Sequence, residues 1–174
     1  MRRLILLRHA KAEASSGRDD FDRALTESGR EDAARMGVWL AARDLIPDLV
    51  VYSSAARTRE TAEIAAARWP RPVKTFAEDG LYDATRHLVL MLVRALPDAA
   101  SVVLVIGHNP GIGDIATQLT SLGSEAERMR MAAKFPTSGL AVLDFPGDHW
   151  ADVEPRTARL VRFVAPKYLD ARPD

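Results

Sequence analysis

Short apolar runs alternate along this chain with longer stretches in which apolar residues recur every three or four positions. The runs at residues 4–7, 49–52, 73–76 and 102–106 predict strands. The early runs are rich in Val, Ile and Leu without polar alternation, which is typical of parallel strands buried on both faces. Strands separated by helical stretches in this way predict an α/β layer fold.

Three sets of apolar residues have the i, i+3, i+4, i+7 spacing of an amphipathic helix. They are Ala33, Met36, Leu40 and Ala41; then Leu88, Met91, Leu92, Ala95 and Leu96; then Ile112, Ile115, Ala116 and Leu119. We expect each set to form the apolar face by which a helix packs on the sheet.

The pattern changes after residue 123. Residues 124–133 are charged and Met-rich and predict a surface helix that ends before Pro136. This helix either forms a rim over a pocket or is plain surface. Residues 139–145 and 159–164 predict two further strands, whose relative direction the pattern leaves open. We expect one domain, 1–174, with the tail from about residue 166 loosely held.

Composition narrows the class of protein. The chain has 174 residues, with 24 basic and 24 acidic side chains, and this balance argues against a nucleic-acid partner. It contains no cysteine, so disulfides, thiolate metal sites and cysteine nucleophiles are excluded, and a cytoplasmic location is favoured. No run approaches the ~18 apolar residues of a membrane span, and residues 4–7 are too few for a signal-peptide core.

Two of the four histidines follow directly on predicted strands. His9 and His108 lie at the carboxyl ends of apolar runs, the edge at which α/β sheets bind ligands. Each alone reads more readily as a loop histidine that caps nearby backbone, but their matched placement reverses this preference in favour of a shared site. His87 and His149 are expected at the surface.

Arg57 points to an anion for a separate reason. A helix is predicted to begin at Ala55 or Ala56, so Arg57 and Arg59 occupy its first turn, where the helix dipole disfavours cations. A bound phosphate would remove that conflict. The alternative is that both arginines point to solvent, at a cost of only a few tenths of a kcal/mol.

Residues 107–111, Gly-His-Asn-Pro-Gly, predict a second helix start. Asn109 suits the N-cap and a contact with substrate, and Pro110 suits the first helical position. His108 then lies directly before the N-terminus of this helix. Three strand ends thus bring Arg8, His9, Arg57 and His108 to one edge of the sheet.

This grouping suits phosphoryl transfer, in which positive donors surround the transferred group. Arg8 and Arg57 would make bidentate contacts with phosphate oxygens. A neutral imidazole is a competent nucleophile near pH 7, because its ordinary pKa is about 6.5. His9 is the better candidate for that role, and His108 is expected to be protonated and to donate to a phosphate oxygen.

These residues resemble the motifs of the histidine phosphatase superfamily. Arg8-His9-Ala10 is similar to its R-H-G motif, with Ala in place of Gly. Residues 53–62 resemble its S-x-x-x-R-[AT]-x-x-T-A segment, and residues 107–111 resemble its second-histidine motif. Similarity to the branch of SixA-type phosphohistidine phosphatases extends to residues 22–26 with Gly29, to residues 81–84 and to residues 136–139.

The resemblance implies a three-layer fold, with a mostly parallel central sheet flanked by helices, and a two-step reaction. His9 would accept the phosphoryl group and water would then hydrolyse the phosphohistidine, while Arg8, Arg57 and His108 hold the phosphate. No metal or cofactor is expected. The substrate would be a phosphorylated protein, such as a histidine-containing phosphotransfer domain, or a small phosphorylated molecule; the oligomeric state stays open.

A general acid is the missing part. Glu78, Asp79 and Asp83 lie in the region where larger superfamily members carry a carboxylate, but they do not match that motif and read more readily as solvated loop carboxylates. Asp79 is our candidate. An alkyl ester needs such an acid, a contribution worth ~10²–10⁴-fold in rate, more than a phosphoramidate does. The gap therefore favours phosphohistidine as the substrate.

Three alternatives stay open. The first is a phosphomonoesterase of the same superfamily, and the second is a phosphate-binding protein without catalysis. The third is a dinucleotide-binding module, since residues 111–116 fit G-x-G-x-x-A after a strand. Residues 108–110 intervene, however, and no acidic residue closes a second strand about 20 residues further on.

Overall fold

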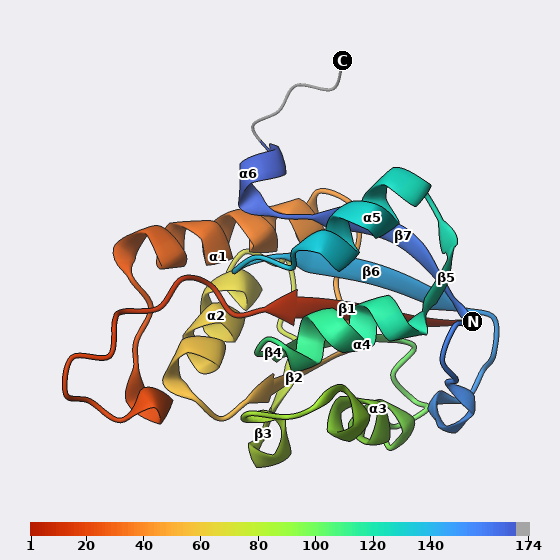
Figure 1. Ribbon diagram of the computed structural model, residues 1–174, viewed down its shortest axis with the longest axis horizontal. Helices are drawn as coiled ribbons and strands as arrows, with labels where there is room; N and C mark the ends of the chain where they lie inside the picture. The colour runs from red at the N-terminus through yellow and green to blue at the C-terminus, as the bar shows by residue number, and fades with distance from the viewer. Residues whose placement is uncertain (170–174) are drawn as a thin grey trace.

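The computed structural model describes residues 1–169, and within them seven strands form a single sheet (Figure 1). In spatial order they are β3 (Lys74–Glu78), β2 (Leu49–Ser53), β4 (Val102–Gly107), β1 (Arg2–Arg8), β6 (Leu140–Phe145), β7 (Ala158–Val164) and β5 (Thr120–Gly123). The first four run parallel, β6 is antiparallel to β1 and β7, and β5 is parallel to β7. The mostly parallel sheet is confirmed; β5, only four residues long, was not predicted.

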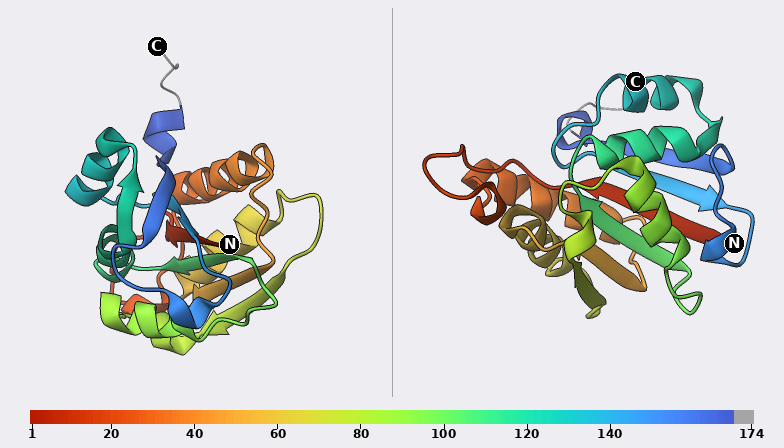
Figure 2. Two further views of the ribbon diagram at one scale, coloured as in Figure 1. Left: turned by 90° about the vertical axis from the view of Figure 1, so that its right-hand side faces the viewer. Right: turned by 60° about the horizontal axis from the view of Figure 1, so that its bottom comes forward.

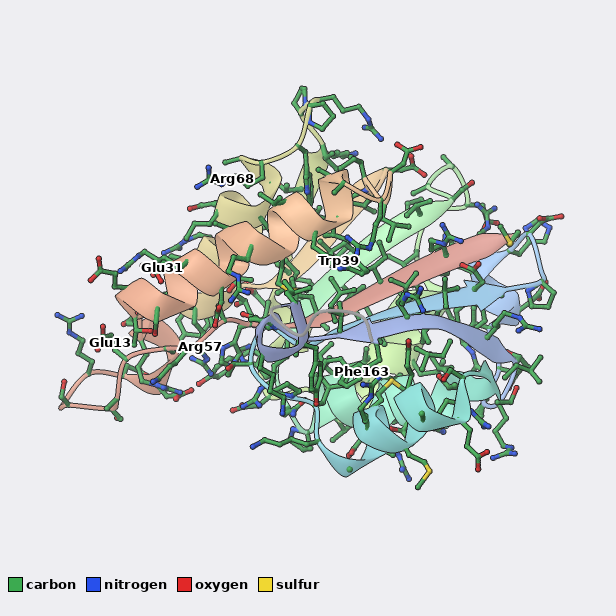
Figure 3. All side chains as sticks on the ribbon, turned by 90° about the horizontal axis from the view of Figure 1, so that it is seen from above. Glu13, Glu31, Trp39, Arg57, Arg68 and Phe163 are labelled. Carbon is green, nitrogen blue, oxygen red and sulfur yellow. The ribbon has the colours of Figure 1, made fainter. Side chains whose placement is uncertain are left out.

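Helices cover both faces of the sheet, as the edge-on view of Figure 3 shows. One face carries α1 (Glu27–Ala41) and α2 (Ala56–Ala66). The other carries α3 (Arg86–Arg94), α4 (Gly111–Leu119) and α5 (Glu125–Ala133). Short turns η1 (Asp20–Asp22), η2 (Asp79–Leu81) and η3 (Trp150–Asp152) interrupt the loops. The three-layer fold is therefore confirmed.

Strand β1 shows why the early apolar runs do not alternate. Leu4 and Leu6 belong to the core on the α3–α4 side, and Ile5 and Leu7 belong to the core on the α1–α2 side. All four side chains are fully buried. A strand covered on both faces has no polar side, and its carboxyl end is thereby fixed between two helical layers.

Two of the three predicted helix faces are correct, and one is wrong. Ala33, Met36 and Leu40 are buried in α1, and the set on α4 is buried throughout. In α3, by contrast, Leu88 and Met91 are 49% and 56% exposed. That helix instead buries Val89, Leu90 and Val93, and Leu96 is buried just beyond its end. Because residues 88–93 are all apolar, periodicity alone cannot select the buried face.

The last third of the chain follows the prediction except at its end. Helix α5 begins after Ser124, whose side chain accepts a bond from the Glu127 amide, and ends before Pro136. We expected the tail from about residue 166 to be loosely held, but α6 (Pro166–Leu169) is helical and its Tyr168 packs against Phe163. Residues 170–174 lie outside the described residues. No helix within the described residues is long and apolar enough to cross a membrane.

Candidate active site

The two histidines lie together because their strands are neighbours. Arg8 is paired in register with Gly107, so His9 and His108 are the next residues on adjacent parallel strands. The His9 amide donates to the Gly107 carbonyl at 3.0 Å, which continues the ladder by one step. The ring centroids are 5.3 Å apart, and both side chains are buried. The predicted meeting of strand ends is thus present in the structure.

One hydrogen bond sets the tautomer of His9. Its Nδ1 lies 2.7 Å from the Ala10 carbonyl oxygen, which can only accept, so Nδ1 carries the proton. The lone pair of a neutral ring is then on Nε2. Burial is the largest cause of the lowered pKa of His9, about 3; the bond to the Ala10 carbonyl opposes it, and the charges of His108, Arg57 and Arg8 add to it. His9 is therefore neutral at pH 7.

His108 has one engaged nitrogen and one without a partner. Its Nε2 lies 2.7 Å from the Ser53 hydroxyl, whereas its buried Nδ1 has no partner among the described residues. Burial and then Arg57 lower its pKa to about 4. These low-dielectric surroundings disfavour a positive charge on His108, and its protonation against a phosphate oxygen stays a prediction. If Ser53 donates to Nε2, the neutral ring still carries its proton on Nδ1.

Arg57 enters the site from the first turn of α2, as predicted. The helix has no side-chain cap, and the Arg57 side chain is almost fully buried while Arg59 is exposed. Figure 3 places Arg57 at the end of the sheet beside the loop that follows β1. Its Nη1 donates to the Asp20 carbonyl at 2.7 Å and its Nη2 to the Asp20 carboxylate at 3.1 Å.

Arg8 is half-buried and is held by the segment that follows α5. Its Nη1 donates to the Phe135 carbonyl at 3.1 Å, and burial lowers its pKa. The neighbouring backbone is fixed as well, since the Ser138 amide donates to the carbonyls of Arg8 and His9. Residues 136–139, which resemble a motif of the SixA-type branch, therefore serve to hold the backbone at the end of β1.

Asn109 has its amide group engaged by the protein. Its Nδ2 donates to the Phe135 carbonyl at 2.8 Å, and its Oδ1 accepts from the Gly113 amide at 3.1 Å. The prediction of Asn109 as the N-cap and Pro110 as the first helical residue is wrong by one position, because α4 starts at Gly111 with Pro110 at the cap position, and the Asn109 side chain instead accepts from within the first turn. Its contact with substrate stays a prediction.

The sequence analysis did not predict that three further residues, Asp20, Tyr82 and Ser53, contribute to the site. Asp20, on η1, accepts from Arg57 and also from the Tyr82 hydroxyl at 2.7 Å. Tyr82 in turn stands edge-on to the His108 ring at 5.6 Å between centroids. Ser53 and Tyr82 fall inside the motifs noted in the sequence, which was the available signal. Asp20 had none, because nothing near it in sequence indicates that its loop folds back onto α2.

Asp79 does not join this group directly. It is exposed on η2, and its carboxylate accepts a bond from the Ser54 hydroxyl. Within residues 1–169 no contact connects it to His9, His108, Arg8 or Arg57. Its role as an acid therefore stays a prediction. His87 and His149 are exposed, as predicted, and His149 pairs with Asp98.

Unpaired donors mark where an anion would bind. Six buried side-chain polar atoms of the described residues lack a partner, and three of them are Arg8 Nε, Arg57 Nε and His108 Nδ1. Leaving such groups unpaired costs about 1–3 kcal/mol each, which a bound oxyanion would offset. A groove of about 490 Å³ is lined by Arg8, Asn109 and the end of α5, so of the three residues with these unpaired donors it reaches Arg8. Among residues 1–169 no cluster of His, Cys, Asp and Glu could hold a metal ion.

Comparison with known proteins identifies the family. The family model for the histidine phosphatase superfamily (branch 1) matches residues 4–83. An uncharacterized protein of Mycobacterium tuberculosis is 39% identical over 163 residues, which cover 92% of this chain and all of the relative. The chain belongs to the histidine phosphatase superfamily. The match to the superfamily model includes Arg8, His9 and Arg57, and the full-length match to the relative extends the likeness past His108.

Two solved structures place the chain more finely within the superfamily. Proteins assigned as the phosphohistidine phosphatase SixA from Agrobacterium tumefaciens and Nakamurella multipartitia are each 33% identical to it. Their TM-scores are 0.78 and 0.81, and each alignment covers 95% of this chain and at least 96% of the other. The resemblance to the SixA-type branch is confirmed, and membership of the superfamily supports phosphatase activity.

Proposed function

We propose that this protein hydrolyses phosphohistidine in proteins by way of a covalent intermediate on His9. The observation that carries the proposal is the bond from His9 Nδ1 to the Ala10 carbonyl, which leaves Nε2 free to attack phosphorus. The lowered pKa keeps that nitrogen unprotonated at pH 7. A nucleophile that needs no base to remove a proton suits this site, since no carboxylate within residues 1–169 forms a hydrogen bond or ion pair with His9.

The reaction has two displacements at phosphorus. In the first, the bond from His9 Nε2 to phosphorus forms as the bond to the leaving imidazole nitrogen breaks, and that nitrogen takes up a proton. In the second, water attacks phosphorus, the bond to His9 breaks, and inorganic phosphate leaves. Arg8, Arg57 and His108 would hold the phosphoryl oxygens in both steps, using donors that are unpaired in the free protein.

The carboxylate nearest these groups is a poor acid, and this supports a phosphoramidate substrate. Bonds from Tyr82 and Arg23 and the charge of Arg57 hold the pKa of Asp20 far below its usual range, so Asp20 is ionised. An alkyl ester would need a proton donor for its leaving oxygen, whereas an imidazole leaving group accepts a proton readily. The 33% identity to two proteins assigned as SixA points the same way.

The test combines a substrate panel with a trapping experiment. A phosphorylated histidine-containing phosphotransfer domain, phosphohistidine and an alkyl phosphate ester are compared as substrates. We expect the phosphohistidine substrates to be favoured, and labelled donor to give an acid-labile, alkali-stable adduct at His9. His9→Asn should lose the adduct and more than ~10³-fold in rate, as with other covalent nucleophiles.

His87→Asn, which changes an exposed histidine on α3, is the matched control and should behave as the wild type. Hydrolysis of esters alone would replace the proposal by a phosphomonoesterase. Wild-type turnover by His9→Asn would remove the covalent mechanism.

A further inference from the structure

Strand β3 is the terminal strand of the sheet, and its outer edge is unpaired. Figures 1 and 2 show it at the margin, and within residues 1–169 it pairs only with β2. Its residues Lys74, Thr75, Phe76 and Ala77 are all exposed, and Phe76 is 54% exposed. An exposed strand edge offers a row of free backbone groups to another strand.

Apolar surface continues from this strand onto α3. Phe76 lines a hollow of about 260 Å³ between β3 and α3, together with Leu92 and Leu96. The same helix exposes Leu88 and Met91, the residues whose burial was wrongly expected from the sequence. We call Phe76, Leu88, Met91 and Leu92, with the edge of β3, the β3–α3 surface. An apolar surface beside an unpaired strand is typical of a strand-addition interface.

The charges on β3 are arranged symmetrically about Phe76. Lys74, Phe76 and Glu78 lie at alternate positions and line the same hollow, so they share one face of the strand. In an antiparallel pair of two β3 strands with a two-fold axis at Phe76, Lys74 faces Glu78 of the second copy, and the reverse pair forms too. Parallel pairing in the same register would instead place like charges together, which is unfavourable.

We propose that two copies of this chain associate through the β3–α3 surface, with their β3 strands paired antiparallel about Phe76. The association joins two sheets into one and brings the two Phe76 side chains into contact. Such an isologous, closed arrangement leaves no further β3 edge to recruit a third copy. It also accounts for Lys74, whose ammonium group has no partner among the described residues.

This interface would adjoin the candidate active site without covering it. Glu78 leads directly into η2 and then to Tyr82, which bonds Asp20 and stands against His108. Arg8, His9 and His108 lie at the carboxyl ends of β1 and β4, which are separated from β3 by β2, and Arg57 lies on α2 directly after β2. The proposal therefore stands or fails independently of the phosphatase reaction.

The test is the oligomeric state of the full chain by sedimentation equilibrium, from micromolar to submillimolar concentration. We expect a dimer whose dissociation constant rises about tenfold or more in Lys74→Glu, since two opposite-charge pairs become like-charge pairs. The double variant Lys74→Glu with Glu78→Lys reverses both pairs and should restore the wild-type constant. Phe76→Ser should weaken the dimer further.

Met129→Ser is the matched control, because Met129 is an exposed apolar residue on α5, far along the sheet from β3. Circular dichroism checks that each variant is folded. A wild type that stays monomeric at every concentration overturns the proposal. So does a dimer that Met129→Ser weakens as much as Phe76→Ser, or one that Lys74→Glu leaves unchanged.

Discussion

At the scale of single residues, two hydrogen bonds assign different chemistry to two identical rings. His9 gives its Nδ1 proton to the Ala10 carbonyl and keeps a lone pair on Nε2. His108 has Nε2 against the Ser53 hydroxyl and Nδ1 free. The first arrangement suits a nucleophile, and the second suits a donor to a phosphate oxygen. The Ala10 carbonyl fixes the tautomer of His9, whereas the Ser53 hydroxyl can donate or accept and fixes the tautomer of His108 only where it donates to Nε2.

Ser53→Ala tests how far the tautomer of His108 depends on its neighbour. If Ser53 donates to Nε2, removal of the hydroxyl leaves Nε2 without that donor, and the proton is no longer held on Nδ1. We expect a loss of about 10- to 100-fold in kcat/KM, the usual effect of removing a group that orients a ligating histidine. Nitrogen NMR of the imidazole should show a changed tautomer for His108 and an unchanged one for His9.

Ser54→Ala is the control, since the adjacent hydroxyl contacts Asp79 instead of His108. A variant Ser53→Ala with the wild-type imidazole spectrum and the wild-type rate would mean that Ser53 does not set the tautomer.

At the scale of elements, one loop spans the gap between β1 and α1 and folds back onto α2. Its anchor is η1, where Asp20 receives two bonds from Arg57 and one from Tyr82. Nearby, the Ala10 amide donates to the Thr61 hydroxyl, which connects the start of the loop to the same helix. The position of Arg57 thus depends on a segment far from it in sequence.

Asp20→Ala tests this anchoring. Removing the carboxylate leaves Arg57 with the backbone bond alone and frees Tyr82, so the guanidinium is less well positioned for phosphate. We expect kcat/KM to fall about 10- to 100-fold, the equivalent of one hydrogen bond to a charged group. Asp20→Asn, which keeps an acceptor, should recover much of the loss.

Asp22→Ala, on the same turn, is the matched control and should retain wild-type kinetics. An increase in affinity for inorganic phosphate in Asp20→Ala would contradict the anchoring role, because it would mean that Asp20 competes with the anion for Arg57.

The sequence predicts those parts of the site that regular structure brings together. Arg8, His9 and His108 follow from the rule that parallel strands end at one edge, and Arg57 follows from a helix start directly after β2. Asp20 could not be found in this way, because an irregular loop has no periodicity from which to infer its path. The buried face of α3 was predicted wrongly for a different reason: residues 88–93 are all apolar, so apolar side chains lie on every face of the helix and the spacing does not select one.

At the scale of the whole molecule, the two buried histidines connect the site to stability. In the unfolded chain each ring takes up a proton near its ordinary pKa of about 6.5. In the folded protein the pKa values are about 3 for His9 and about 4 for His108. Below pH 6.5 the unfolded state therefore binds more protons than the folded state, and the free energy of unfolding must fall as the pH falls.

Urea unfolding across this range checks the sign. We expect the free energy of unfolding to decrease steadily from about pH 6.5 towards about pH 3 and to be flat with respect to these two groups above about pH 7. His108→Asn should reduce the slope between about pH 6.5 and about pH 4. His87→Asn should keep the wild-type slope, and equal slopes for both variants would contradict the lowered pKa of His108.

The backbone bond from His9 to Gly107 has a consequence for how this protein can change. The spacing between the proposed nucleophile, His9, and the proposed phosphate ligand, His108, is an inter-strand distance, and no loop length enters it. Insertions, deletions or grafts in the surrounding loops would alter which molecule is admitted while the displacement at phosphorus stays intact. New specificity is therefore reachable by remodelling the entrance alone.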